Sequence, residues 1–232
     1  MSDYVFTLSS GEEVPVVITG RRGVRNITLR PKNIPRREIC ISKPWLVSDA
    51  AAIRFLVSKQ SWIECIFQKC PAKVVIKPGD EIEFLGRRVL LQHNPNVRLN
   101  KFNDDKSVLV IGGSIDMFER RVRDVIKSEF LSVLKEMVCS APGDFWPKRI
   151  AIRDTSSRWG SCSSSGTMSF SWRLAFAPLD VMRYVVMHEL AHKKHMDHSQ
   201  QFWATVRELY GFGVERAKRW LSQNGGQLHR YF

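Results

Sequence analysis

The sequence has no apolar run that approaches the roughly 18 residues needed to cross a bilayer. It begins with Met-Ser-Asp-Tyr, without a basic segment followed by a small-residue cleavage site. We therefore expect a soluble, cytoplasmic protein with no membrane partner. Cysteines are few and never spaced as C-x-x-C, so nothing indicates a disulfide framework or a thiolate zinc site, and reduced thiols are expected. The five are Cys40, Cys65, Cys70, Cys139 and Cys162.

The chain is long enough to bury one large core or two modest ones, because 44% of its 232 residues are hydrophobic. Its formal net charge of +13 favours an acidic partner. The excess is spread evenly: residues 1–112 hold 18 Lys and Arg against 11 Asp and Glu, and residues 113–232 hold 18 against 12. An even spread argues against a detachable basic tail and leaves two interpretations open, a solvated basic surface and a nucleic-acid-binding one.

The first 112 residues are predicted to form a β-rich region with one helix, because short apolar runs alternate there with glycine and proline. The predicted strands span residues 14–19, 24–30, 37–41, 73–76, 81–84, 87–91 and 107–111. The helix is expected over residues 48–68, with Ser48 and Asp49 as its cap. We expect this region to be a twisted antiparallel β unit.

Helical periodicity dominates after Gly113. A long amphipathic helix is predicted from Ser114 or Asp116 to about Val138. Further predicted elements are strands over residues 149–153 and 167–174, a helix opened by Pro178 and Asp180, and helices over residues 199–210 and 214–223. The sequence therefore predicts an α+β fold with two regions, residues 1–112 and residues 113–232.

Four of the six histidines fall within eleven residues, at positions 188, 192, 195 and 198. His188 and His192 lie four apart, so on a helix both point at one ion, with Glu189 on the flank. A catalytic zinc ion needs two or three protein ligands, a vacant position for water and a carboxylate that takes the water's proton. The alternative is a helix whose histidines only form hydrogen bonds in a core. Against it, both imidazoles lie on the apolar face of the predicted helix. The segment predicts a zinc-dependent hydrolase with Glu189 as general base.

The third ligand requires a turn. A straight helix would carry His198 roughly 9 Å too far along its axis. Its spacing from His192 is that of the metzincin ligand set, in which a glycine three residues after the second histidine makes the turn. That position is His195 here, so we expect His195 or Asp197 to reverse the chain through left-handed backbone angles. Asp197 and Gln200 resemble a capping box, which would place His198 in the first turn of the next helix.

Two alternatives to His198 stay open. His195 lies on the same helical face as His188 if the helix persists, although one turn further along. A carboxylate from the following helices, Glu208 or Glu215, would complete a gluzincin-type site. The spacing favours His198.

Several motifs together resemble the YgjP-like family of metal-dependent hydrolases, which is similar in its catalytic core to the SprT-like and WLM-type zinc proteases. They are Arg158-Trp159-Gly160-Ser161-Cys162, Phe170-Ser171-Trp172-Arg173-Leu174, His188-Glu189-Leu190-Ala191-His192, His198-Ser199 and Phe202-Trp203. The resemblance implies a minimal zincin-like fold for residues 113–232, with a small sheet packed on the histidine helix. It also implies zinc ligands His188, His192 and His198 and a catalytic Glu189.

Substrate contacts are less defined. Arg158, Arg173 and Tyr184 are candidates to stabilise an oxyanion, and Trp159 is a further substrate-binding candidate. The strand over residues 167–174 is predicted to be an edge strand that pairs with an extended peptide. The expected partner is thus a peptide or protein substrate. The competing hypothesis is a basic nucleic-acid-binding protein that uses zinc only to brace its fold.

Overall fold

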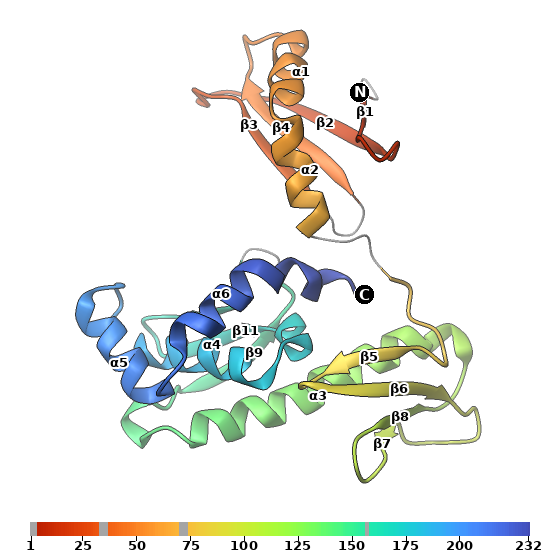
Figure 1. The fold of residues 1–232 in the computed structure, drawn as a ribbon, viewed down its shortest axis with the longest axis vertical. Helices are drawn as coiled ribbons and strands as arrows, with labels where there is room; N and C mark the ends of the chain where they lie inside the picture. Colours follow the sequence, from red (N-terminus) through yellow and green to blue (C-terminus); the bar gives the residue numbers. More distant parts are fainter. Residues whose placement is uncertain (1–3, 33–36, 70–73, 156–157) are drawn as a thin grey trace. The chain divides into compact units, whose positions relative to one another are not determined.

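The computed structural model of the chain describes residues 4–32, 37–69, 74–155 and 158–232 (Figure 1). It forms two compact units: the first extends to Val74 and includes residues 229–231, and the second is Val75–Leu228 with Phe232. Both units combine helices with small sheets, which confirms the α+β class. No described helix is both long and apolar enough to span a membrane.

The first unit is a four-stranded sheet with two helices on one face. Its strands are β1 (Tyr4–Thr7), β2 (Glu13–Arg21), β3 (Thr28–Lys32) and β4 (Glu38–Pro44), in the order β1-β2-β4-β3. Alternate residues of β2 and β4, such as Val14 and Ile39, are fully buried against the helices, where they meet Leu56 and Ile63. Because side chains alternate along a strand, the other face of the sheet carries the exposed residues.

Three predictions for the first unit need correction. The sheet is mixed, since β2 and β4 run parallel, so it is not an antiparallel unit. The expected helix over residues 48–68 is two helices, α1 (Asp49–Ser58) and α2 (Gln60–Lys69), because Lys59 leaves helical geometry at φ −109° and ψ 14°. Residue 73 of the expected strand over residues 73–76 lies outside the described residues, and Val74 forms only an isolated bridge with Tyr231. Ser48 does cap α1, accepting the N–H of Ala51.

A second sheet and a long helix open the second unit. The sheet has the order β5-β6-β8-β7, from β5 (Glu81–Phe84), β6 (Arg87–His93), β7 (Lys101–Phe102) and β8 (Val108–Ile111). A short 3₁₀ turn, η1 (Ile115–Met117), leads into α3 (Phe118–Cys139). The apolar stripe of α3, from Val122 to Val138, is buried and contacts β8, β9 and α4. The predicted boundary after residue 112 would cut through this core, whereas the structure divides the chain after Val74.

The third sheet and the remaining helices surround the histidines. Its strands are β9 (Arg149–Arg153), β10 (Gly160–Cys162) and β11 (Thr167–Ser171), in the order β10-β11-β9. The other elements are η2 (Gly143–Phe145), η3 (Trp172–Phe176), α4 (Leu179–Ala191), α5 (Gln200–Tyr210), α6 (Val214–Asn224) and η4 (Gly225–His229). The prediction of an edge strand over residues 167–174 is wrong, because β11 is central and ends at Ser171. The edge strand that contacts α4 is β10.

Candidate metal centre

The histidine helix α4 is buried on nearly every side. Val181, Met182, Val186 and Leu190 are among the α4 side chains that are at most 1% exposed. A helix that is apolar all round belongs in the interior of a domain, and α4 contacts α3, α5, α6 and β10. The helix ends at Ala191, with His192 as its C-cap. This confirms that the chain stops being helical before His198.

Three imidazoles converge after that turn. Ligand nitrogens of His188, His192 and His198 all lie within 4.8 Å of one another. The Nε2 atoms of His188 and His198 are 3.2 Å apart. Two nitrogens that are each about 2.05 Å from a tetrahedral zinc ion would be about 3.3 Å apart. The donor set and its spacing therefore fit one zinc-sized ion.

His195 contributes through its backbone. Its carbonyl oxygen accepts a hydrogen bond from Nδ1 of His192 at 2.9 Å, which leaves Nε2 of His192 for the metal side. Such a second hydrogen bond fixes the tautomer and orientation of a ligating imidazole. The imidazole of His195 is absent from the group of potential ligands found among the described residues.

The turn after α4 uses neither of the expected devices. Among the described non-glycine residues, positive φ angles occur at Leu85, Lys106 and Phe232, so neither His195 nor Asp197 is left-handed. The N-cap of α5 is Ser199, whose hydroxyl accepts the N–H of Phe202 at 3.3 Å. Asp197 accepts the N–H of Ser199 at 3.3 Å, and hydrogen bonds with the side chain and the backbone of Ser199 lower the pKa of Asp197. The expected capping box is wrong, and His198 precedes α5.

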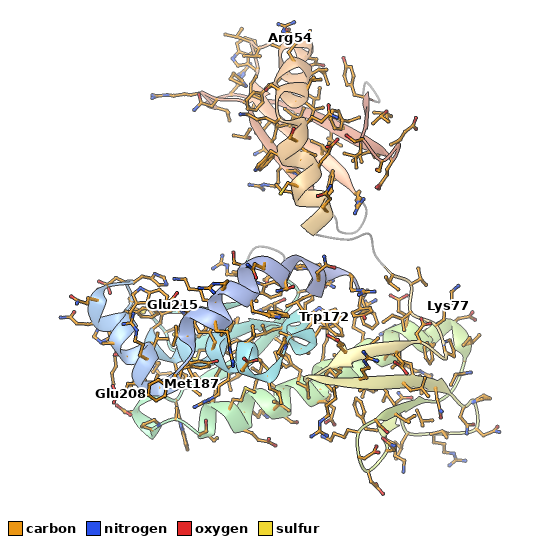
Figure 2. The ribbon with its side chains drawn as sticks, in the orientation of Figure 1. Arg54, Lys77, Trp172, Met187, Glu208 and Glu215 are labelled. Carbon is orange, nitrogen blue, oxygen red and sulfur yellow. The ribbon has the colours of Figure 1, made fainter. Side chains whose placement is uncertain are left out.

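The positions of Glu208 and Glu215 do not support either carboxylate as the third metal ligand. Glu208 on α5 and Glu215 on α6, both labelled in Figure 2, are exposed side chains. Neither belongs to the group of potential metal ligands that the described part of the chain contains.

Aromatic rings form the wall behind the imidazoles. The ring of Phe202, fully buried, lies 4.5 to 4.9 Å from the rings of all three histidines in the group. Trp203 lies 5.7 Å from His188. Phe202 therefore belongs to the core, whereas Trp203 is partly buried.

Burial lowers the pKa of His188 to about 4, with the neighbouring His192 and His198 acting in the same direction. A neutral imidazole is the form that coordinates a metal. Nδ1 of His188 is buried and has no hydrogen-bond partner within the described ranges. His188 is therefore held by packing, whereas His192 is held by a hydrogen bond.

Glu189 lies between α4 and the edge strand β10. It is 5% exposed. Burial raises its pKa to about 7, while the charge of Arg158 and a hydrogen bond from the backbone N–H of Cys162 act in the opposite direction. A Cβ at Gly160 would lie 2.6 Å from Oε1 and Cγ of Glu189. Glycine at this position is therefore what lets the carboxylate lie against the strand.

The four substrate-binding candidates have different surroundings. Arg158 is exposed and acts electrostatically on Glu189. Trp159 lies against Gly225, where an added Cβ would be 3.1 Å from the indole. Tyr184 lies 5.9 Å from the ring of His188, and burial raises its pKa to about 12, so its hydroxyl keeps its proton at neutral pH.

Arg173 has a different place from the one expected. Its side chain is 2% exposed and forms an ion pair with Asp154 at 3.1 Å. It also donates to the backbone oxygen of Phe232 at 3.0 Å. A side chain that is buried and engaged in this way holds the core together, so the structure argues against a direct contact with substrate.

Sequence reasoning missed Gly160, the N–H of Cys162 and the carbonyl of His195 as parts of this site. Gly160 and Cys162 stand inside the Arg-Trp-Gly-Ser-Cys motif, but no strand was predicted over residues 160–162. Gly160 itself was the available signal, because a glycine in or beside a strand often marks a close approach of the backbone to another group. Nothing in the sequence indicates that a carbonyl group would orient His192.

A buried glutamate on a helix that contacts a small sheet, beside three clustered histidines of which one is on that helix, one caps it and one follows it, defines the class of metal-dependent hydrolases. The chain belongs to the YgjP-like family, described as a metallopeptidase domain, whose model matches residues 25–224. A similar solved structure is that of the metallopeptidase zymogen of Pyrococcus abyssi abylysin, at 24% identity over 46% of this chain and 98% of that chain, with a TM-score of 0.33. Comparison with curated proteins gives no match.

Proposed function

We propose that the protein is a zinc-dependent peptidase in which His188, His192 and His198 hold the ion and Glu189 is the general base. The observation that carries this proposal is the convergence of the three imidazoles, with ligand nitrogens within 4.8 Å of one another, beside a carboxylate that is 5% exposed. Membership of a metallopeptidase family supports the same chemistry.

Zinc, when bound, supplies a Lewis acid and lowers the pKa of water to about 7. Glu189 is suited to take up and release a proton near neutral pH, because its pKa is about 7. In peptide hydrolysis it would accept a proton from the attacking water and pass it to the leaving amine. The hydroxyl of Tyr184 and the guanidinium of Arg158 are the candidates to donate hydrogen bonds to the oxyanion.

The peptide substrate would lie along β10. This strand is the edge of its sheet and contacts α4, so an extended peptide there would add a strand within reach of the histidines. Trp159 directly precedes the strand and provides an aromatic surface beside it.

A purely structural zinc site is less well supported. Structural zinc sites are closed by four protein ligands. The group of potential ligands in the described part of the chain contains three, which leaves a coordination position for water or substrate.

The test compares Glu189→Gln with Glu208→Gln. The second change is the matched control, because Glu208 is exposed on α5 (Figure 2). Metal content would be measured by mass spectrometry and turnover with a peptide library. We expect Glu189→Gln to keep its zinc and to lose about 10²- to 10⁴-fold in turnover, whereas Glu208→Gln matches the wild type. Undiminished turnover by Glu189→Gln would refute the role of Glu189, and a preparation that binds no zinc would refute the cofactor.

A further inference from the structure

The third sheet, beside the histidines, has one face toward the helices and one away from them. Directly paired residues of neighbouring strands share a face. Met168 and Phe170 of β11 are fully buried, and on their face Gly160 of β10 lies against Glu189 of α4. The opposite face, which we name the outer face, carries the alternate residues of the three strands. They are Arg149, Ala151, Arg153, Ser161, Thr167, Ser169 and Ser171.

A pocket of about 300 Å³ lies on the outer face, next to the loop that precedes β10. We name it the outer pocket. It is lined by Arg153, Thr155, Arg158, Gly160, Ser161, Ser169 and Phe170. Gly160 separates the outer pocket from the proposed general base, because its backbone lines the pocket while its missing side chain leaves room for Glu189. The pocket and Glu189 are therefore divided by a single strand.

The outer pocket is positively charged. Its two arginines, Arg153 and Arg158, form no ion pair within the described ranges. The three strands of the sheet contain no acidic residue, and Asp154, which follows β9, is paired with Arg173 at 3.1 Å. The charge of Arg158 also acts on Glu189. Arg153 is therefore the cation that is left for a ligand.

Two hydroxyl groups lie beside this cation. Ser161 and Ser169 are directly paired across β10 and β11, and neither hydroxyl takes part in a hydrogen bond in the part of the chain that the structure describes. Arg153 pairs with Ser171, two residues beyond Ser169. Strand spacings place the Cα atoms of Arg153 and Ser169 about 8 Å apart, which an extended arginine side chain covers. A guanidinium and two hydroxyls are suitable donors for the oxygens of one carboxylate.

A peptide that pairs with β10 would reach the outer pocket with one side chain. Such a peptide would lie about 4.8 Å from the strand. Its residue opposite Ser161 would have a side chain on the outer face, whereas the two neighbouring side chains would point to the face of Gly160 and Glu189. The alternation thus gives the pocket one position of the substrate and the metal side the positions next to it.

We propose that the outer pocket binds the carboxylate of a substrate glutamate or aspartate opposite Ser161, with Arg153 as its ionic partner and the hydroxyls of Ser161 and Ser169 as donors. The inference rests on the proposed peptidase activity and specifies its substrate class, extended peptides with an acidic residue at one fixed position. A carboxylate fits better than a phosphate, because one cation is free of other partners and a phosphate group carries a charge of about −1.5 to −2.

The test uses eight-residue peptides in which Glu, Gln or Lys occupies each position in turn. The zinc-loaded full chain cleaves them, and mass spectrometry gives kcat/KM and the cleaved bond, from which the positions are counted. We expect the glutamate peptide to exceed the glutamine peptide by about tenfold in kcat/KM at one position. At the positions on either side the difference should stay below about twofold, because those side chains point to the other face.

Arg153→Glu should reduce the glutamate-to-glutamine ratio from about ten to about one or less and make lysine the favoured residue at that position. The matched control is Arg149→Glu, the same change on an exposed residue of the same strand and face, outside the pocket lining. It should keep the ratio within about twofold, since four residues along a strand span about 13 Å and the screening length at 0.1 M salt is about 10 Å. Circular dichroism melts would verify that both variants fold.

A binding measurement separates this inference from the peptidase activity. The same peptides, labelled with fluorescein, are titrated with Glu189→Gln by fluorescence anisotropy, since binding needs no turnover. Binding of the glutamate peptide that depends on Arg153, without cleavage by the wild type, would refute the peptidase activity and support the pocket. Cleavage with no preference for glutamate at a single position would overturn the pocket and leave the activity standing. The pocket would also be overturned by equal effects of Arg149→Glu and Arg153→Glu, by a stronger preference for phosphoserine than for glutamate, or by no binding of any peptide.

Discussion

The two units of the chain use charged side chains in opposite ways. In the second unit, Arg173 and Glu189 are 2% and 5% exposed, and each lies between packed elements. In the first unit, Arg21 and Arg30 stand on an uncovered sheet. Burying a charge costs free energy unless it has partners. The buried charges therefore mark places where geometry or reactivity depends on them, whereas the exposed ones remain available to a solute.

The sharpest test of the second unit compares two neighbouring histidines. His198→Ala removes an imidazole of the cluster, and we expect zinc affinity to fall by more than about a hundredfold, beyond what loss of a supporting contact costs. His195→Ala keeps the backbone carbonyl that accepts from His192, so zinc affinity should change by less than about threefold. Competition with a fluorescent chelator measures both affinities. Equal losses in the two variants would contradict the assignment of His198.

Gly160→Ala tests whether β10 positions the buried carboxylate. The added Cβ would stand 2.6 Å from Oε1 of Glu189, so the side chain must move. We expect kcat/KM to fall about 10- to 100-fold, because small displacements of a catalytic group are costly, while zinc content is unchanged. Gly143→Ala, where an added Cβ has nothing within 4 Å, is the control. Wild-type kcat/KM in Gly160→Ala would show that the contact does not matter.

Arg173→Met tests the buried charge that has no part in the proposed chemistry. Loss of the guanidinium leaves Asp154 and the oxygen of Phe232 without their partner, and we expect the free energy of unfolding to fall by about 2 kcal/mol. The control is Arg216→Met, because Arg216 is 79% exposed in its ion pair with Asp180. Its loss should change the free energy of unfolding by less than about 1 kcal/mol. Urea denaturation measures both. Similar values for the two variants would remove the contrast between buried and exposed charges.

Lys43→Met tests a charged side chain of the first unit that is buried, unlike Arg21 and Arg30. The side chain of Lys43 is 10% exposed and pairs with Asp49 at 3.1 Å. We expect the free energy of unfolding to fall by about 1 kcal/mol, because Asp49 stays partly exposed and water can replace the lost ammonium group as its partner. Arg54→Met, the control on an exposed residue of α1, should be neutral. Hydrogen exchange, read separately for β4 and α4, would check that the destabilisation is confined to the first unit; increased exchange in α4 would mean that the units unfold together.

Elements with strong local signals could be predicted from the sequence. The helix with the histidines, the long helix α3 and the strand β9 lie where the sequence predicts them. In α3 burial repeats on one face at a fixed interval, whereas α4 is buried on nearly every side and β9 is partly buried at its three central residues. The three clustered histidines follow from their spacing once the helix is known to end early. Short elements had no such signal: β10 has three residues and β7 has two, too few to show alternation.

Features that depend on tertiary contacts were beyond the sequence. The break at Lys59 interrupts a continuous apolar pattern without glycine or proline. The parallel pairing of β2 with β4 and of β6 with β8 joins strands that are not neighbours in the chain. The unit boundary after Val74 depends on α3 packing against β8, a contact between segments whose separate patterns gave no indication of it.

The turn between the second and third histidines also bears on how related sites are found in other sequences. The hydrogen bond from His192 Nδ1 to the carbonyl of His195, the Asp197 carboxylate and the Ser199 cap accompany this turn, which has no left-handed residue. A search pattern that demands glycine three residues after the second histidine would pass over this chain. A pattern that asks instead for a short polar residue just before the third histidine and a serine just after it would recover it, and would leave position 195 free to vary.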